Sequence, residues 1–341
     1  MIGKLNHHPA KWWEVTHSDK IRCTLCPRFC DLGEGQNGFC FIRKNHEGEL
    51  VTLGYGNTTG FALDPIEKKP LNHFLPGSTI LSFGTAGCNL GCKFCQNWSI
   101  SKAQLDHDNS FYSSPTDVVS LAKKYSAPSI AFTYNDPVIF GEFAADITKI
   151  AREEGVHTVF VTAGYVTKSA RDEVFAGASA ANIDLKAFSE RFYKNLAYAS
   201  LMDVLDTIVW VKEKTNIWLE LTTLLIPGEN DSPAEIKEMS KWIMENLGDR
   251  VPIHFTAFHP DFKMRNIPPT PPKTLQIARN IALDVGLKYV YTGNVHDPEG
   301  QTTYCPGCGA KVIERNRHSV TNNLLVKGDC PFCSTKLDGV F

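Results

Sequence analysis

Three cysteines, Cys88, Cys92 and Cys95, lie close together in the segment TAGCNLGCKFCQNWSISK, with the spacing C-x-x-x-C-x-x-C. Grouped thiolates favour zinc or iron-sulfur clusters over hard ions such as magnesium. A closed zinc site takes four protein ligands, so it would need a histidine, or a cysteine from another module, to complete this set. A four-iron cluster held by three thiolates instead leaves one iron open, and an open coordination site is what metal chemistry requires.

The remaining cysteines form two groups of four, which bring the total to eleven. An odd number of cysteines argues against the simple disulfide framework of a small secreted protein. Groups of four, three and four are instead expected of metal sites. The two groups of four are Cys23, Cys26, Cys30 and Cys40 near the N-terminus, and Cys305, Cys308, Cys330 and Cys333 near the C-terminus.

The C-terminal group consists of two C-x-x-C pairs, in the sequences CPGCG and CPFC. Each pair supplies two thiolates at a tight turn, and two pairs complete a zinc tetrahedron, which predicts a zinc-ribbon-like module. A small module of this kind has little hydrophobic core, so zinc would supply much of its folding free energy. The alternatives are two unrelated thiol pairs or a redox-active pair, although the βα context of thioredoxin-like chemistry is missing.

The N-terminal group has the pattern C-x-x-C-x-x-x-C followed by Cys40. Four soft ligands fit either a closed zinc site or an auxiliary iron-sulfur cluster, and we prefer zinc as a structural staple of a loop-rich module. An auxiliary cluster would instead suggest electron delivery to or from the catalytic site. Gly33, Gly35 and Gly38 match G-x-G-x-x-G, but no strand precedes them, so a dinucleotide site is rejected in favour of a backbone that wraps a metal.

The elements between these groups alternate between apolar strands and amphipathic helices, which indicates an α/β fold with parallel strands. Helices are predicted over 115–125 and from Ser232 to Gly248, where Ser, Pro and Gly mark the ends. Six βα units favour a partial (β/α)6 TIM-like barrel, although a doubly wound sheet has the same local pattern. The predicted strands are 78–84, 128–134, 156–162, 180–186, 217–225, 251–258 and, more weakly, 288–292.

This pattern divides the chain into three predicted parts. Residues 1–75 form a Cys-rich N-terminal metal-binding module, residues 76–295 form the partial barrel, and residues 296–341 form the zinc-ribbon-like module. In both candidate architectures, ligands bind beyond the carboxyl ends of the strands. Cys88, Cys92 and Cys95 directly follow the first predicted strand of the barrel, so we expect them at that end.

The three-cysteine loop reads C-x-x-x-C-x-aromatic-C, with Phe94 as the aromatic residue. This resembles the signature of radical S-adenosylmethionine (SAM) enzymes. The resemblance implies the partial barrel that is typical of this superfamily. In that superfamily SAM chelates the open iron of a 4Fe-4S cluster, and an electron from the cluster cleaves SAM to methionine and a 5′-deoxyadenosyl radical that abstracts hydrogen. The resemblance implies a 4Fe-4S cluster and SAM as cofactors, a reductant such as flavodoxin or ferredoxin, and an oxygen-sensitive enzyme.

The resemblance covers about residues 75–300 and is closest to the activating-enzyme branch. Within it, the chain is most similar to the AmmeMemoRadiSam system radical SAM enzymes, a family named for co-occurrence with Ammecr-type and Memo-type proteins. The resemblance also implies a set of SAM contacts. The segment YNDP, with Asn135 and Asp136, stands where the superfamily usually has Gly-Gly-Glu-Pro. The implied contacts are Phe94 of the cysteine loop, Asn135, Asp136, Asp184 and Lys186 in NIDLKAF, and His259 in FTAFHP.

Each proposed contact has a structural alternative. Asp184 and Lys186 are two residues apart on a strand and face the same side, so they could be an internal ion pair. Asp136 and His259 both precede proline, which favours chain reversal. Glu220 is an acid within an otherwise apolar strand, and it is either a paired core carboxylate or a substrate contact.

Composition limits the class of partner. Lys and Arg number 35 against 37 acidic residues, so there is no basic excess of the kind that nucleic acid or an anionic membrane requires. No apolar run approaches the roughly 18 residues of a membrane span, and the N-terminal residues contain no apolar core of a signal peptide. We therefore expect a cytoplasmic protein with neither nucleic-acid nor membrane partners.

The leading hypothesis is a radical SAM enzyme of the oxidoreductase or lyase type. Its substrate would be a small molecule or a protein side chain; the alternative is a protein glycine, as in glycyl-radical enzyme activation. A rival from another class is a non-catalytic zinc-binding interaction protein. The rival explains two groups of four cysteines but not a group of three at the ligand-binding end of a βα array.

Overall fold

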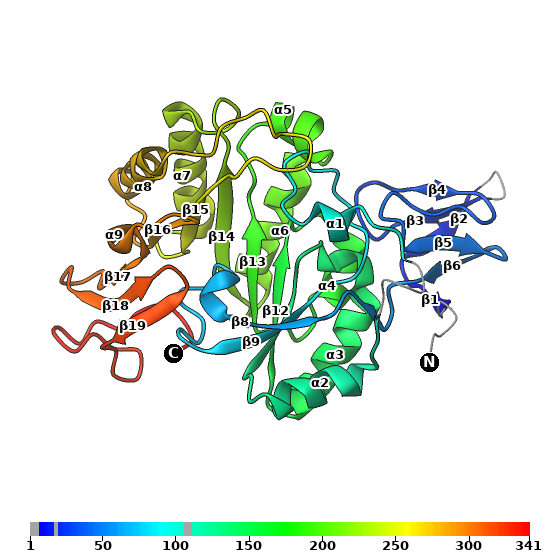
Figure 1. Cartoon of the computed structure of the whole chain (residues 1–341), viewed down its shortest axis with the longest axis horizontal. Helices are drawn as coiled ribbons and strands as arrows, with labels where there is room; N and C mark the ends of the chain where they lie inside the picture. Colours follow the sequence, from blue (N-terminus) through cyan, green and yellow to red (C-terminus); the bar gives the residue numbers. More distant parts are fainter. Residues whose placement is uncertain (1–6, 17–19, 106–110) are drawn as a thin grey trace.

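The computed structural model describes residues 7–16, 20–105 and 111–341. Its centre is an eight-stranded sheet in the order β16-β15-β14-β13-β12-β11-β9-β8 (Figure 1). Only β8 pairs antiparallel to its neighbour; all the other pairs are parallel. The strands are β8 Phe61–Pro65, β9 Thr79–Phe83, β11 Ser129–Phe132, β12 His157–Thr162, β13 Ala180–Asp184, β14 Trp218–Leu225, β15 Ile253–Ala257 and β16 Val290–Gly293.

Helices follow the parallel strands along the chain, as the sequence predicts for βα units. The helix predicted over 115–125 is confirmed, with Ser114 as its N-cap in a capping box with Asp117. The helix predicted after Ser232 also is confirmed, and it ends before Gly248, which has a φ of 87°. The helices are α1 Trp98–Ser101, α2 Pro115–Lys124, α3 Gly141–Glu153, α4 Lys168–Val174, α5 Glu190–Phe192, α6 Leu201–Lys214, α7 Pro233–Leu247, α8 Pro272–Val285 and α9 Pro298–Gln301, with short turns η1 Ile66–Lys68, η2 Pro137–Phe140 and η3 Tyr193–Ala197.

The predicted fold class, an α/β fold with a mostly parallel sheet and small cysteine-rich modules, is confirmed. The core lies against the sheet, where the parallel register sets Phe83, Phe132 and Phe160 side by side on three neighbouring strands. All three rings are fully buried, and the centroids of Phe132 and Phe160 are 5.0 Å apart. Such continuous apolar strands are typical of a sheet covered on both faces.

Small sheets form the two cysteine-rich ends of the chain, which lie at opposite ends of the long axis (Figure 1). Residues 61–65 are predicted as part of the N-terminal module, but they form β8 and pair with β9. The small-sheet strands are β1 His8–Pro9, β6 Glu49–Thr52 and β5 Arg43–His46; β2 Trp13–Val15, β3 Ile21–Cys23 and β4 Asp31–Leu32; β7 Asn57–Thr58 with β10 Phe111–Tyr112; and β17 Thr303–Tyr304, β18 Lys311–Asn316 and β19 Ser319–Asn323.

The C-terminal module also contacts the segment that follows β8. The amide of Val340 donates to the carbonyl of His73 at 2.7 Å, and the amide of Leu75 donates to the carbonyl of Val340 at 2.7 Å. The Arg315 guanidinium donates to the carbonyl of Asn72 at 2.7 Å. Since β8 and β16 are the two edge strands of the open sheet, these contacts join the segments that follow its two edges.

Candidate active site

A cavity of about 800 Å³ lies at the carboxyl ends of the parallel strands. This is the position at which α/β sheets bind ligands, and the volume is in the range of small-molecule sites. One side of the cavity is the cysteine loop, and another is the C-terminal module. All three cysteines of the loop and five of the six predicted SAM contacts line it, namely Cys88, Cys92, Cys95, Phe94, Asn135, Asp136, Asp184 and Lys186.

The three cysteines of the loop all line this cavity but differ in burial. Cys88 and Cys92 are buried and Cys95 is partly exposed. Burial raises the pKa of Cys88 to about 12 and the pKa of Cys92 to about 11. A metal ion reverses such a shift because a coordinating thiol is deprotonated outright.

The cysteine loop is held from several directions by backbone hydrogen bonds. The amides of Gly91 and Lys93 donate to the carbonyls of Ala197 and Leu196, at 2.9 and 2.8 Å. Lys102 Nζ donates to the carbonyl of Leu90 at 2.6 Å. A loop fixed in this way keeps its sulfur atoms in place, which lowers the entropy cost of binding a cluster.

Asn135 lines the cavity, but its side chain serves the loop. Its amide nitrogen donates to Thr85 Oγ1 at 3.0 Å and to the Gly87 carbonyl at 2.8 Å, while its oxygen accepts from the Thr85 amide at 3.3 Å. In this structure Asn135 braces the loop, and its predicted contact with SAM stays a prediction. That bracing acts on the residue directly before Cys88.

Asp136 lies at the wall of the cavity with both carboxylate oxygens occupied. One oxygen accepts from the Val138 amide at 3.1 Å and from Thr162 Oγ1 at 2.8 Å, and the other accepts from the Ala163 amide at 3.1 Å. Burial raises the pKa of Asp136 despite these donors. Asp136 thus forms the turn that its structural alternative describes and joins the ends of β11 and β12, while its predicted contact with SAM stays a prediction.

Asp184 and Lys186 form an ion pair, with Lys186 Nζ 2.9 Å from Asp184 Oδ2. Burial alone would lower the pKa of Lys186, but the charges of Asp184 and the Cys92 thiolate raise it well above its usual range. The Lys186 ammonium also lies 6.0 Å from the centre of the Phe94 ring. A fixed cation beside a cysteine ligand and the cavity can bind a carboxylate there.

His259 is the one predicted SAM contact that the structure does not bring to the cavity. It is exposed and is not among the lining residues, so its role stays a prediction. Another histidine, His254 of β15, lines the cavity instead. His254 was not singled out from the sequence. The available signal was a titratable residue within an apolar strand, VPIHFTAF, which is the same signal that drew attention to Glu220.

Glu220 is a core carboxylate. It is fully buried and accepts hydrogen bonds from the amides of Asn72 and His73, at 3.0 and 2.8 Å, from the Trp218 indole at 3.0 Å and from His254 Nε2 at 2.7 Å. Burial raises the pKa of Glu220, but the hydrogen bond and charge of His254 outweigh this and lower it to about 2. Glu220 thereby fixes the ring of His254 at the cavity wall.

The C-terminal module supplies further lining residues that no sequence signal indicated. Arg315 is buried and contacts Glu67, with 3.5 Å between the nearest atoms of the pair. Arg317 and His318 lie at the turn between β18 and β19 and also line the cavity. The module thus forms part of the same cavity as the cysteine loop.

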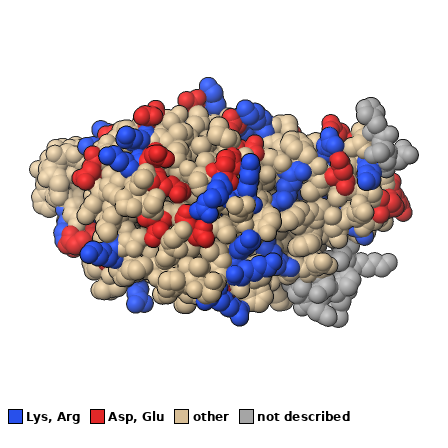
Figure 2. All heavy atoms as spheres, turned by 90° about the horizontal axis from the view of Figure 1, so that it is seen from above, with Lys and Arg blue, Asp and Glu red and all other residues tan. Residues whose placement is uncertain are grey.

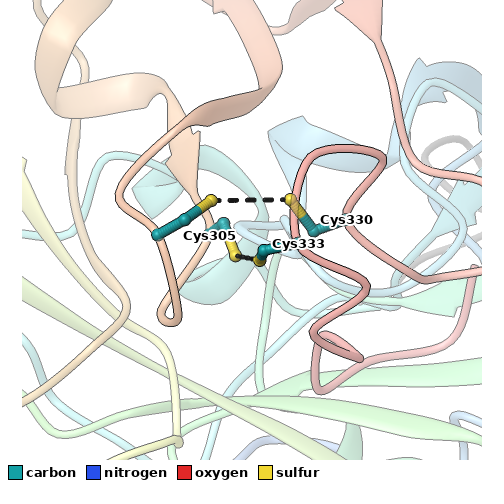
Figure 3. Close-up of side chains that lie close together, drawn as sticks. Cys305, Cys330 and Cys333 are labelled. Carbon is teal, nitrogen blue, oxygen red and sulfur yellow. Dashed lines mark hydrogen bonds between the residues drawn. The ribbon is translucent and has the colours of Figure 1, made fainter.

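The C-terminal cysteines are gathered as a metal site would require. The ligand atoms of Cys305, Cys308, Cys330 and Cys333 all lie within 4.8 Å of one another. Figure 3 shows the sulfur atoms turned toward each other, with 3.5 Å between Cys305 and Cys333 and 3.7 Å between Cys308 and Cys330. Hydrogen bonds from Thr335 lower the pKa of Cys333 to about 6, which favours the thiolate form that binds metals.

Comparisons with known proteins agree with this geometry. Residues 83–243 match the family model described as the Radical SAM superfamily. The chain belongs to the radical SAM superfamily and to its activating-enzyme-like branch. It is an enzyme by class, and the superfamily implies a 4Fe-4S cluster and SAM as cofactors.

Individual relatives cover most of the chain. It is 41% identical to the uncharacterized protein MJ0808 of Methanocaldococcus jannaschii, over 96% of this chain and 98% of that one. It is 20% identical to the pyruvate formate-lyase 1-activating enzyme of Escherichia coli, over 63% and 93%. A radical SAM methyltransferase from Sphaerobacter thermophilus shares the fold, with a TM-score of 0.52 and 15% identity over 65% and 68% of the two chains.

Charges of both signs occur on the face of the molecule in Figure 2. Figure 2 shows Lys and Arg interspersed with Asp and Glu over the face that is in view, without a continuous field of one sign. Among the described helices, none is long and apolar enough to cross a membrane.

Proposed function

We propose that Cys88, Cys92 and Cys95 hold a 4Fe-4S cluster whose fourth iron binds SAM. The observation that carries this proposal is a set of three cysteines at the wall of a cavity. In the described part of the chain, no histidine, carboxylate or further cysteine joins them in a compact set of ligands. The residues present fit a cluster with an open iron because three buried or half-buried thiols face space large enough for a cofactor and a substrate.

When bound, the cluster would supply the electron that cleaves SAM to methionine and a 5′-deoxyadenosyl radical. The chain's own residues would hold SAM in place. Lys186, charged and fixed by Asp184, would bind the carboxylate of SAM, while Phe94 packs beneath the Lys186 ammonium and against Phe192. Asn135 and Asp136 would act through the loop and the strand ends that they brace.

The substrate that best fits the cavity is a small molecule with an acidic group. Most cations at the cavity have an ionic partner: Lys68 and Lys69 share Asp64, and Arg315 contacts Glu67. Arg317 lines the cavity and has no ion pair with any residue that the structure describes. A free guanidinium at a turn that closes one side of the site is suited to a carboxylate or phosphate.

The glycyl-radical alternative is a second candidate, supported by similarity to the pyruvate formate-lyase 1-activating enzyme. Against it, the C-terminal module narrows the cavity through Arg315, Arg317 and His318. We favour a small molecule and a place among the AmmeMemoRadiSam system enzymes, with Ammecr-type and Memo-type proteins as partners and flavodoxin or ferredoxin as the reductant.

We also assign zinc to the C-terminal cysteines, whose spacing suits the roughly 3.8 Å edges of a zinc tetrahedron.

The test is anaerobic reconstitution with iron and sulfide. A reduced-cluster EPR signal that changes on addition of SAM would support the proposal. A colourless, zinc-only protein with no such signal would favour the non-catalytic zinc-binding class. Deuterium transfer from labelled candidate substrates into 5′-deoxyadenosine would then identify the hydrogen donor.

A further inference from the structure

The N-terminal cysteines are close together, but they are arranged differently from the C-terminal ones. A Cβ atom at Gly38 would lie 3.8 Å from both the Cys30 and the Cys40 sulfur atoms, so these two thiols flank the same glycine. The amide of Cys23 donates to the carbonyl of Cys30 at 3.0 Å, which brings together the two ends of the segment that carries Cys26. The four thiols therefore surround one region of the module.

This group is more widely spaced than a zinc site. Among the described residues, the C-terminal cysteines alone have ligand atoms that all lie within 4.8 Å of one another. One zinc ion at a bond length of about 2.3 Å holds its thiolates about 3.8 Å apart. The thiolates of a four-iron cluster each bind a different iron, so they must be further apart than the ligands of a single ion. The loop of Cys88, Cys92 and Cys95 also lacks the compact spacing.

In spacing, the N-terminal group is like the Cys88 loop, our proposed cluster site, and unlike the C-terminal group, our proposed zinc site. We propose that Cys23, Cys26, Cys30 and Cys40 hold an iron-sulfur cluster, and not the zinc ion that the cysteine spacing alone led us to prefer. Four thiolates close its coordination shell, so this cluster has no open iron and does not bind SAM. The inference concerns metal content and holds whether or not the chain cleaves SAM.

The surroundings of the group suit an anionic cluster. Cys23, Cys26 and Cys40 are buried, with exposed fractions of 6%, 9% and 7%. Hydrogen bonds to the sulfurs and exclusion of solvent are the means by which a protein tunes such a cluster.

The site also lies against the loop that carries the catalytic cysteines. The carbonyl oxygen of Cys40 is 2.0 Å from the position that a Cβ atom would take at Gly87, which has a φ of 86°. Only glycine fits there. The Arg28 guanidinium donates to the carbonyl of Asn89 at 2.5 Å, which adds a second contact on the other side of Cys88. The proposed cluster is therefore adjacent to the Cys88 loop.

The test separates the two clusters. The triple variant Cys88→Ala, Cys92→Ala, Cys95→Ala is purified and reconstituted anaerobically with iron and sulfide. We expect it to keep about four iron atoms and about four sulfides per chain, with the EPR signal of a reduced cluster that SAM does not perturb. Further replacement of Cys26 and Cys30 by Ala should remove that iron and signal. Zinc at the C-terminal cysteines, measured in the same samples, reports whether the rest of the chain is folded.

A second comparison keeps the proposal testable if the triple variant fails to fold. The otherwise unmodified chain should hold about eight iron atoms, and the Cys26→Ala, Cys30→Ala variant about four, by Mössbauer quantification. The proposal is overturned if the triple variant holds no cluster and two zinc ions per chain. It is equally overturned if the unmodified chain holds only four iron atoms and the Cys26→Ala, Cys30→Ala variant keeps all of them. Loss of SAM cleavage with full iron content would instead count against the proposed function.

Discussion

The side-chain amide of Asn135 donates a hydrogen bond of 2.8 Å to the carbonyl of Gly87, the residue directly before Cys88. Asn135 follows β11, and Gly87 follows β9, so the bond ties the ends of two neighbouring strands. The position of the cysteine loop thus depends on a residue that donates no metal ligand.

Asn135→Ala should release this loop. The change leaves Thr85 and Gly87 without buried partners, at a cost of about 1–3 kcal/mol for each unsatisfied group. We expect reconstituted iron at the Cys88 loop to fall by at least half, with little change in zinc. The control is Asn246→Ala, because Asn246 is exposed and bonds only to Trp242 one turn earlier. Equal iron contents in the two variants would contradict the bracing role.

Lys186→Met should weaken SAM binding. The substitution keeps the length of the side chain but removes the ammonium that Asp184 fixes beside Cys92. A charge-assisted hydrogen bond is worth about 1.5–3 kcal/mol, so the Kd for SAM should rise roughly 10- to 100-fold while cluster content stays unchanged. Equilibrium binding to the reconstituted protein measures this, with Lys194→Met as the control on a neighbouring turn. An unchanged Kd would mean that the Asp184–Lys186 ion pair only stabilises the fold and does not bind SAM.

Arg317→Glu should affect the substrate and not SAM. Arg317 lines the cavity without an ion pair to any described residue, so reversing its charge should raise the KM of an acidic substrate at least tenfold and leave the Kd for SAM within twofold. Lys327→Glu provides the matched control, because Lys327 is exposed on the same module and does not line the cavity. If both variants behave alike, the cation at the turn does not recognise substrate.

Protonation of the buried His73 ring should make the free energy of unfolding depend on pH. Burial lowers the pKa of His73 to about 4, against an ordinary value of 6.5, and its ring nitrogens bond to the Asp338 carbonyl and the Tyr291 hydroxyl at 2.6 Å each. The unfolded chain therefore binds this proton more tightly, so stability falls as the pH drops from about 6.5 toward 4. At pH 5 the loss is about 2 kcal/mol.

Apparent melting temperatures at pH 7.5 and pH 5.0 measure this effect. His73→Gln removes the titrating group while keeping a side chain that can hydrogen-bond to Asp338 and Tyr291. The variant should be less stable at pH 7.5 but should lose less on acidification than the parent chain. The same drop in both proteins would assign the acid sensitivity to other groups.

Local patterns predicted much of this fold. The strands of the βα array and the ends of α7 at Ser232 and Gly248 follow from hydrophobic runs and capping residues that lie next to each other in sequence. The grouping of Cys305 and its three partners follows from the tight turns of C-x-x-C pairs. Such features need no knowledge of distant contacts.

Long-range contacts account for what the sequence did not reveal. Strand β8 is short, contains Asp64 and Pro65, and is defined by its pairing with β9. The hydrogen bonds of Asn135 to Gly87 and of Asp136 to Ala163 join segments that are distant in sequence, so no local pattern indicated them. Arg317 reaches the cavity only because the C-terminal module packs back onto the start of the barrel.

The central claim is that three cysteines and an open iron cleave SAM, and one measurement tests it most directly. 5′-Deoxyadenosine is quantified after dithionite reduction of the anaerobically reconstituted chain with SAM. The parent chain and Cys305→Ala, which alters the separate C-terminal site, should form it, whereas Cys88→Ala, Cys92→Ala and Cys95→Ala should each reduce it to background. Formation of 5′-deoxyadenosine by any of the three loop variants, or its absence from the iron-loaded parent chain, would contradict the account.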